Sequence, residues 1–172
     1  MLDCLTERWR ARLAHQNKFQ AQVALVEREG RRVLLCEPET FMNASGEAVQ
    51  ALAAFYRVSA ERTLIVLDDA DLNLGEIRLR PSGSSGGHHG LESLERHLGT
   101  RDYPRLRIGI GREQSGVREI TDYVLSQFST PDAALLEKVL ARACDQVECW
   151  LREGITQAMN RFNGKIKEKV SE

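Results

Sequence analysis

Hydrophobic residues recur along this chain with two periods, and segments of the two kinds alternate. Five segments show the three-to-four-residue repeat of an amphipathic helix: residues 2–13, 45–56, 90–98, 129–152 and 155–162. Five others alternate apolar with polar residues or form short apolar runs, as strands do: residues 20–27, 31–36, 63–67, 76–80 and 105–110. The alternation predicts an α/β fold with a central mixed β-sheet flanked by helices.

Turn-forming residues separate these segments. Residues 28–30 join the first two strands into a hairpin, and Gly99 and Gly154 each end a helix. No internal repeat or long linker divides the chain, so residues 1–172 are predicted to form one domain. The apolar run at 63–67 predicts a strand buried on both faces, and the alternation at 105–110 predicts arginines on an open face.

Composition is that of an ordered protein without a membrane-spanning segment. The 172 residues are 42% hydrophobic and 28% charged, which excludes a disordered tail. No apolar run approaches the roughly 18 residues of a membrane helix, and charged residues near the N-terminus rule out a signal-peptide core. The four cysteines form no C-x-x-C pair, so we expect free thiols and a cytoplasmic protein.

Charge is unevenly distributed, although the net charge is only −1. Residues 78–118 hold eight arginines, no lysine and four acidic residues, a net charge of +4, and the remainder carries −5. Such a segment either binds phosphate groups on an otherwise acidic body or forms a solvated charged face.

Two clusters of polar residues follow predicted strands. At 40–46, Asn43 or Ser45 can cap the next helix, or the Asn43 amide can point into a cleft. At 68–71, three aspartates can orient a histidine, bind a metal or begin a turn, and the carboxyl ends of strands are where sites form in α/β sheets.

Two further clusters carry glycines and arginines. Residues 82–90 contain four glycines and two histidines, which indicates a mobile loop and not a P-loop, because no Gly-Lys-Ser/Thr follows. Arg80 and Arg107 can clamp a phosphate, since guanidinium groups match its oxygens, or can serve only solubility.

Taken in order, the clusters resemble the bacterial-type peptidyl-tRNA hydrolase family. The likeness extends over nearly the whole chain and is strongest in residues 38–46 (PETFMNASG), 68–72 (DDADL), 86–91 (GGHHGL) and 105–111 (RLRIGIG). It implies a monomeric α/β enzyme that hydrolyses the ester between a peptide and the 3′ end of tRNA. The resemblance implies no metal and no cofactor.

The resemblance also implies roles for individual residues. Asp68 corresponds to the aspartate that orients a histidine base, and Asn43 to the asparagine that holds the water or the carbonyl. Phe41 and Met42 line the cleft, and His89 stands where the family has a substrate-contacting asparagine. Arg80 and Arg107 correspond to the basic pair for a tRNA phosphate, and Gly86, Gly87 and His88 to the mobile loop.

The sequence departs from the family pattern at its start. The family opens with a strand, a Gly-Asn-Pro-Gly turn and a motif carrying the catalytic histidine, and these 172 residues contain none of them. We therefore expect an N-terminally truncated form with impaired activity and an unpaired sheet edge, which a second copy can cover.

Two other functions remain open. A non-catalytic relative would bind tRNA or another RNA through Arg80 and Arg107. A metal-assisted hydrolase would use Asp68, Asp71, His88 and His89 as ligands.

Overall fold

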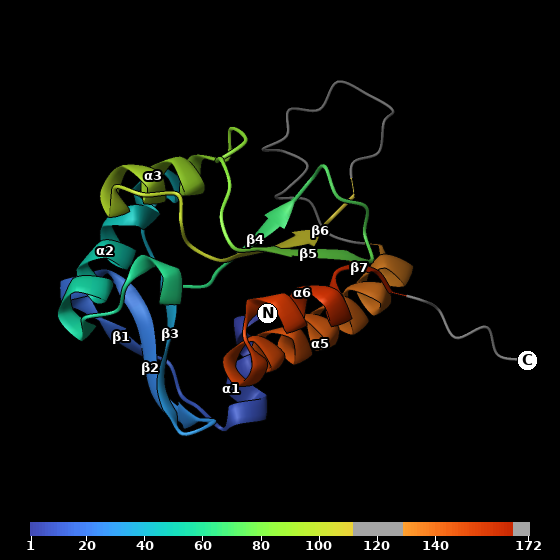
Figure 1. Cartoon of the computed structure of the whole chain (residues 1–172), viewed down its shortest axis with the longest axis horizontal. Coiled ribbons are helices and arrows are strands. Elements are labelled where there is room, and N and C mark those ends of the chain that lie inside the picture. Colours follow the sequence, from blue (N-terminus) through green and yellow to red (C-terminus); the bar gives the residue numbers. More distant parts are fainter. Residues whose placement is uncertain (112–128, 167–172) are drawn as a thin grey trace, which may run out of the picture. The chain divides into compact units, whose positions relative to one another are not determined.

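The computed structural model describes residues 1–111 and 129–166, which divide into two compact units. Unit 1 comprises Met1–Ile65 and Pro81–Pro104, and unit 2 comprises Val66–Arg80 and Arg105–Glu172. Figure 1 labels the helices and strands along the chain. The predicted α/β fold with mixed strand directions is confirmed, whereas the assignment of residues 1–172 to one domain stays a prediction.

Unit 1 contains an antiparallel sheet in the order β1-β2-β3. Its core packs Phe19, Ala21, Val23 and Leu52 together, so the hairpin lies against helix α2. The elements of this part are α1 (Leu2–Trp9), β1 (Ala14–Gln16), η1 (Asn17–Phe19), β2 (Ala21–Arg28), β3 (Arg31–Pro38), η2 (Met42–Ala44) and α2 (Ser45–Tyr56). The predicted hairpin and the helix over 45–56 are confirmed.

Two helices of unit 1 approach each other closely at a glycine. Unit 1 also contains η3 (Ala60–Arg62) and α3 (His89–Leu98), and α3 packs on α2 and η2. The N–H of Gly46 donates to the Ser93 hydroxyl at 3.0 Å. A Cβ added at Gly46 would lie 2.3 Å from the Ser93 carbonyl oxygen, so only glycine allows this contact.

Unit 2 is a four-stranded sheet covered by two helices. The strand order is β4 (Ile65–Asp69), β6 (Arg105–Gly109), β5 (Glu76–Arg80), β7 (Gly164–Lys165). The Ile65 N–H donates to the backbone carbonyl of Pro104, and the Ile110 N–H donates to the backbone carbonyl of Asp69. Strands β4 and β6 therefore run parallel. Strand β5 is antiparallel to β6 and β7. The sheet is therefore mixed.

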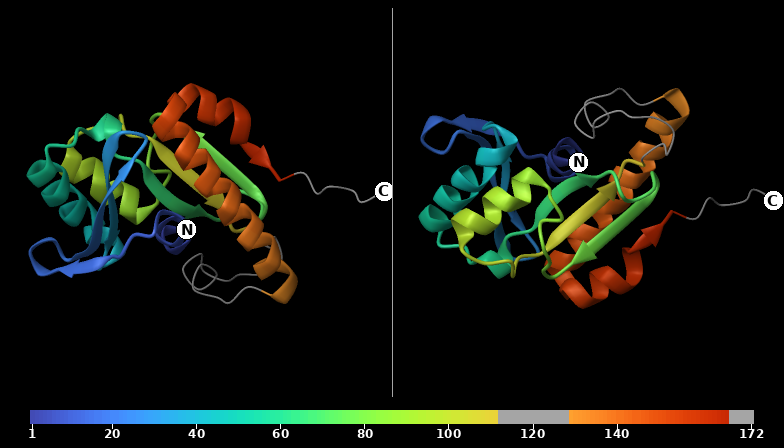
Figure 2. Two further views of the ribbon diagram at one scale, coloured as in Figure 1. Left: turned by 90° about the horizontal axis from the view of Figure 1, so that it is seen from below. Right: turned by 90° about the horizontal axis from the view of Figure 1, so that it is seen from above.

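Helices α5 (Thr130–Glu153) and α6 (Ile155–Phe162) pack on each other and on β5, and α5 also contacts β6 (Figure 2). The apolar side of the strands is fully buried: Ile77, Leu79, Leu106 and Ile108 are at most 6% exposed. The predicted helix boundaries at Ser129 and Gly154 are confirmed, and the Ser129 side chain accepts a hydrogen bond from the N–H of Asp132.

One asparagine ties the end of α6 to the sheet. Asn163 accepts from the Leu79 N–H at 2.7 Å and donates to the Leu79 carbonyl at 3.1 Å, as a paired strand would. The buried Gln146 donates to Asn163 and to the Ala158 carbonyl, both at 3.0 Å. The turn after α6 is thereby fixed on β5.

Several details of the sequence prediction are wrong. The first helix ends at Trp9, before Leu13, because Arg10 adopts a left-handed conformation. Phe55, which the helical period places in the apolar stripe of α2, is 59% exposed. Residues 65–68 of β4 are half-buried instead of fully buried, and strands β1 and β7 are too short to show a period in the sequence.

Arg105, predicted on an open face, is instead only 2% exposed. Strand β4 lies at one edge of its sheet, and coverage of that edge by a second copy stays a prediction. Within residues 1–111 and 129–166, no helix is both long and apolar enough to cross a membrane. Arg112, Glu113 and Arg118 of the basic segment lie outside the described residues.

Replacing Gly46 with alanine tests the close approach of α2 and α3. Gly-to-Ala changes inside helices usually stabilise a protein by about 0.5–1 kcal/mol. Here we expect Gly46→Ala to lower the free energy of unfolding by about 1–3 kcal/mol, because the new methyl group overlaps the Ser93 backbone. Urea unfolding measures the change, with Arg62→Ala at an exposed position on η3 of the same unit as the control. A stabilised Gly46→Ala variant would contradict the packing.

Candidate functional site

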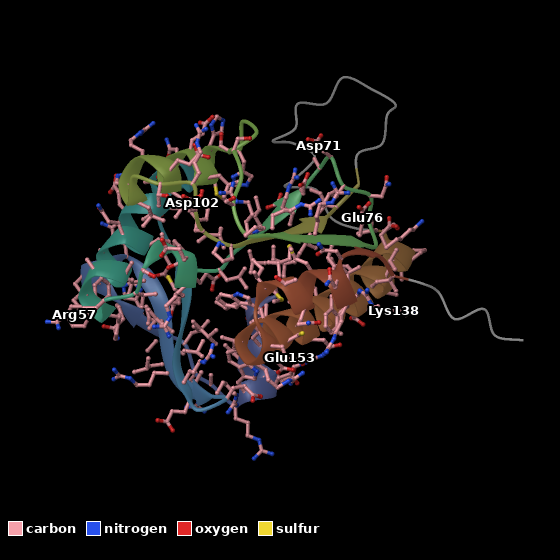
Figure 3. All side chains as sticks on the ribbon, in the orientation of Figure 1. Arg57, Asp71, Glu76, Asp102, Lys138 and Glu153 are labelled. Atoms are coloured by element: carbon pink, nitrogen blue, oxygen red, sulfur yellow. The ribbon has the colours of Figure 1, made fainter. Side chains whose placement is uncertain are left out.

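Two of the predicted polar clusters lie in unit 2, and the first is the aspartate series at the carboxyl end of β4. Asp68 and Asp69 end the strand, so their side chains point to opposite faces of the sheet. Asp69 has only 6% of its side chain exposed, and its Oδ1 accepts from the Asp71 N–H at 2.9 Å. Figure 3 marks Asp71 in the segment between β4 and β5. Asp68 is half-buried and has no ion pair or hydrogen bond to another described side chain.

The second cluster of unit 2 is a group of arginines on neighbouring strands. Register places Arg78 opposite Arg107 and Arg80 opposite Arg105. Arg80 and Arg107 are therefore diagonal neighbours, whose side chains start about 7–8 Å apart and are long enough to meet at one anion. The predicted pair is thus brought together. Arg107 forms an ion pair with Asp69 through its Nε, an arrangement that the sequence did not predict.

The remaining predicted residues lie in unit 1, at η2 and the start of α3. Phe41 is 88% exposed and Met42 is 56% exposed. Asn43 is exposed, and neither Asn43 nor Ser45 caps α2, so the capping interpretation is wrong. Within the described part of the chain, the Asn43 amide forms no hydrogen bond and is available to a ligand.

The glycine-rich loop leads directly into α3. Gly86 and Gly87 have φ values of +59° and +84°, a left-handed backbone that favours glycine. A Cβ at Gly90 would lie 2.7 Å from the Met42 sulfur and 3.0 Å from the His88 ring. The loop and the Phe41–Asn43 segment, separated by some 40 residues in the chain, therefore meet in unit 1, as the order of the motifs implied.

Each of the four histidines has a local partner. His88 caps α3, because its Nδ1 accepts from the N–H groups of Gly90 and Leu91 at 3.1 and 3.3 Å. His89 is exposed, with its Nδ1 3.4 Å from the Glu92 carboxylate. His97 lies 2.8 Å from the Ser93 carbonyl oxygen through its Nδ1.

His15 has a hydrogen-bond partner at each of its two ring nitrogens. Its Nε2 is 2.5 Å from the Asn17 amide oxygen and its Nδ1 is 2.5 Å from the Glu39 carboxylate. These hydrogen bonds raise the pKa of His15 above its ordinary value, since both ring nitrogens face acceptors. The described residues contain no group of three or more His, Cys, Asp and Glu side chains arranged to hold a metal ion.

Comparison with known proteins identifies the family. The family model described as Peptidyl-tRNA hydrolase matches residues 1–170. The chain belongs to the peptidyl-tRNA hydrolase family. Members of this family are hydrolytic enzymes, and the resemblance noted in the sequence is confirmed.

Individual peptidyl-tRNA hydrolases match over most of their length. The protein from Thermosynechococcus vestitus is 44% identical over 170 residues, which cover 96% of this chain and 83% of the relative. The protein from Brevibacillus brevis is 39% identical over 166 residues, which cover 96% of this chain and 87% of the relative. The crystal structure of peptidyl-tRNA hydrolase from Acinetobacter baumannii superposes with a TM-score of 0.88 at 32% identity, covering 95% of this chain and 83% of that one.

Two residues of the peptidyl-tRNA hydrolase fold were missed in the sequence. Asp69 lies beside the predicted Asp68, but only the three-dimensional contact shows that it partners Arg107. Ser93 fixes the start of α2 and is 1% exposed. Two adjacent aspartates in the sequence could have drawn attention to Asp69. Nothing in the helical pattern distinguishes Ser93.

If His88 caps α3, its replacement should change the stability of the protein in a way that depends on whether the new side chain can accept a hydrogen bond. Loss of a helix cap typically costs about 1 kcal/mol. We expect His88→Ala to lower the free energy of unfolding by this amount and His88→Asn, which keeps an acceptor, to lose much less. Denaturant unfolding of both variants, with exposed His89→Ala as the control, measures the effect. Equal losses for the Ala and Asn variants at position 88 would contradict the cap.

Proposed function

We propose that this chain binds peptidyl-tRNA and contributes to hydrolysis of the ester between the peptide and the tRNA. The observation that carries the proposal is the family match over residues 1–170. Water adds to the ester carbonyl, the peptide leaves as an acid, and the 3′ oxygen of the tRNA receives a proton. No metal or cofactor enters this scheme.

Each site residue has a role suited to its chemistry. Asn43 positions the water or the carbonyl with an amide that both donates and accepts, and Asp68 orients an imidazole. Phe41 and Met42 offer exposed apolar surface to the peptide, and His89 presents an exposed ring to the substrate. Gly86, Gly87 and His88 shape the loop, and Arg80 with Arg107 binds a tRNA phosphate.

The reaction also needs a general base, and the contacts of His15 and His88 suit neither of these two histidines to that role. His15 is stabilised in its protonated form, and His88 uses its Nδ1 lone pair as a helix cap. We therefore propose that these 172 residues alone turn over peptidyl-tRNA weakly. An additional segment carrying the family's catalytic histidine would supply the base beside Asp68.

A cytoplasmic location fits the proposed substrate. None of the four cysteines, all within the described residues, forms a disulfide. Burial raises the pKa of the Cys36 thiol to about 12, with a contribution from Glu37, so that this thiol stays protonated. Such thiols suit a reducing compartment.

A chimera tests the catalytic proposal. The 172-residue chain is compared with the same chain preceded by a segment built on the family pattern, with a strand, a Gly-Asn-Pro-Gly turn and the histidine-bearing motif. We expect release of peptide from peptidyl-tRNA to be faster in the chimera by about 10²–10⁴-fold, the usual contribution of a general base.

The control chimera carries alanine in place of the added histidine and is expected to remain slow. Turnover by the 172-residue chain as fast as that of the Thermosynechococcus vestitus relative would contradict the missing-base proposal. Undiminished tRNA binding without turnover in the chimera would instead favour the non-catalytic RNA-binding alternative.

Substitution of the two arginines tests the phosphate site. Arg80→Ala and Arg107→Ala are each expected to weaken tRNA binding by about tenfold, because each removes a charged hydrogen bond to phosphate. The slope of log affinity against log salt concentration should fall by about one for each phosphate that is no longer bound. Filter binding at several salt concentrations measures both quantities. Arg62→Ala, at an exposed position on η3, is the control and should leave the slope unchanged.

A further inference from the structure

The arginine face of β5 and β6 is electrostatically unfavourable by itself. In an antiparallel pair, residues directly opposite each other point to the same side, so Arg78 faces Arg107 and Arg80 faces Arg105. Like charges directly opposite across two strands repel. Four positive side chains therefore start from one small area of the sheet, and long flexible arginines in such a field would spread apart.

Two acidic residues in the same unit hold members of this group. Glu76 contacts Arg78 at 2.8 Å along the same strand. Asp69, from the neighbouring strand β4, forms the ion pair with Arg107. The two acids differ in what surrounds them, because Glu76 retains 18% of its side-chain exposure and Asp69 retains 6%.

The Asp69 carboxylate has a different partner at each oxygen, a hydrogen bond at one and an ion pair at the other. Its Oδ1 accepts from the Asp71 N–H, and its Oδ2 faces Nε of Arg107. Arg107 nevertheless keeps 34% of its side chain exposed. A guanidinium has five N–H bonds, so an arginine that is ion-paired on its Nε side still offers the four N–H bonds of its terminal amino groups to an anion.

We propose that Asp69 is a positioning residue that fixes Arg107 for a tRNA phosphate. The proposal rests on the proposed function of Arg107. A free arginine loses side-chain entropy when it binds, whereas an arginine already held by a buried carboxylate has lost much of it beforehand. Asp69 thus acts through Arg107 and does not itself touch the substrate.

This role makes a prediction opposite to that of simple electrostatics. Removing a negative charge beside a phosphate site should strengthen tRNA binding if only net charge matters. Positioning predicts the reverse: Asp69→Asn should weaken tRNA binding about tenfold. The asparagine oxygen can still accept from the Asp71 N–H, so the turn after β4 is retained.

A double-mutant cycle on the 172-residue chain tests the proposal. Deacylated tRNA is titrated against the original chain, Asp69→Asn, Arg107→Ala and the double variant at two salt concentrations. We expect each single variant to lose affinity and the double variant to bind no more weakly than Arg107→Ala, because the two residues act as a unit. Additive losses, or tighter or unchanged binding by Asp69→Asn, overturn the proposal.

Glu76→Gln provides the matched control. It removes an acid from another arginine of the same face and is expected to leave affinity unchanged or to increase it. Affinity lost equally in Glu76→Gln and Asp69→Asn would mean that any acid on this face matters, which would overturn the specific role of Asp69.

The outcomes separate this proposal from the proposed function. If Arg107→Ala leaves tRNA affinity unchanged, the phosphate role of Arg107 fails and Asp69 has nothing to position. If Arg107→Ala weakens binding but Asp69→Asn does not, only the positioning role fails. Should Asp69→Asn not fold, Asp69→Glu shifts the carboxylate by one methylene while keeping its charge, and unchanged affinity in that variant overturns the proposal.

Discussion

The pairing of β5 with β6 fixes two surfaces at once. Their register buries Ile77, Leu79, Leu106 and Ile108 on one side and sets four arginines on the other. Each large apolar side chain buried this way contributes about 1.5–3 kcal/mol. A slip of one residue would exchange the two faces and bury the charges, so the hydrophobic side of the pair also determines where the arginines are. The position of the candidate phosphate site therefore follows from the packing of the core.

In unit 1 the main constraint is close packing at two glycines, where there is no room for a side chain. Gly46 and Gly90 lie where a Cβ would overlap Ser93 or Met42, and these contacts hold η2, α2 and α3 together. The exposed side chains of Phe41 and Asn43 form no cap here, whereas the Met42 sulfur is itself part of the contact at Gly90. Phe41 and Asn43, which suit a ligand, are thus carried by a scaffold whose close contacts are made by other residues.

Regular elements with strong periods could be predicted from the sequence, and contacts between elements could not. The helix over 45–56 and the hairpin have clear patterns, whereas β1 and β7, with three and two residues, are too short to show any period. The order of the motifs indicated Arg80 and Arg107 as a pair, and strand register makes them diagonal neighbours. The contact between Asp69 and Arg107 joins side chains of two strands that are distant in the sequence, and the burial of Arg105 runs against the alternating pattern of its own strand. One sequence reveals neither.

The exposure of Phe41 and Met42 has a thermodynamic consequence. These side chains order water around them in the free protein, and an apolar peptide that covers them would release that water. Binding of this kind is accompanied by a negative change in heat capacity. It also depends little on sequence, because a methionine thioether adapts its shape to different neighbours. A surface of this type suits a ligand whose peptide part varies from one molecule to the next while its nucleic-acid part stays the same.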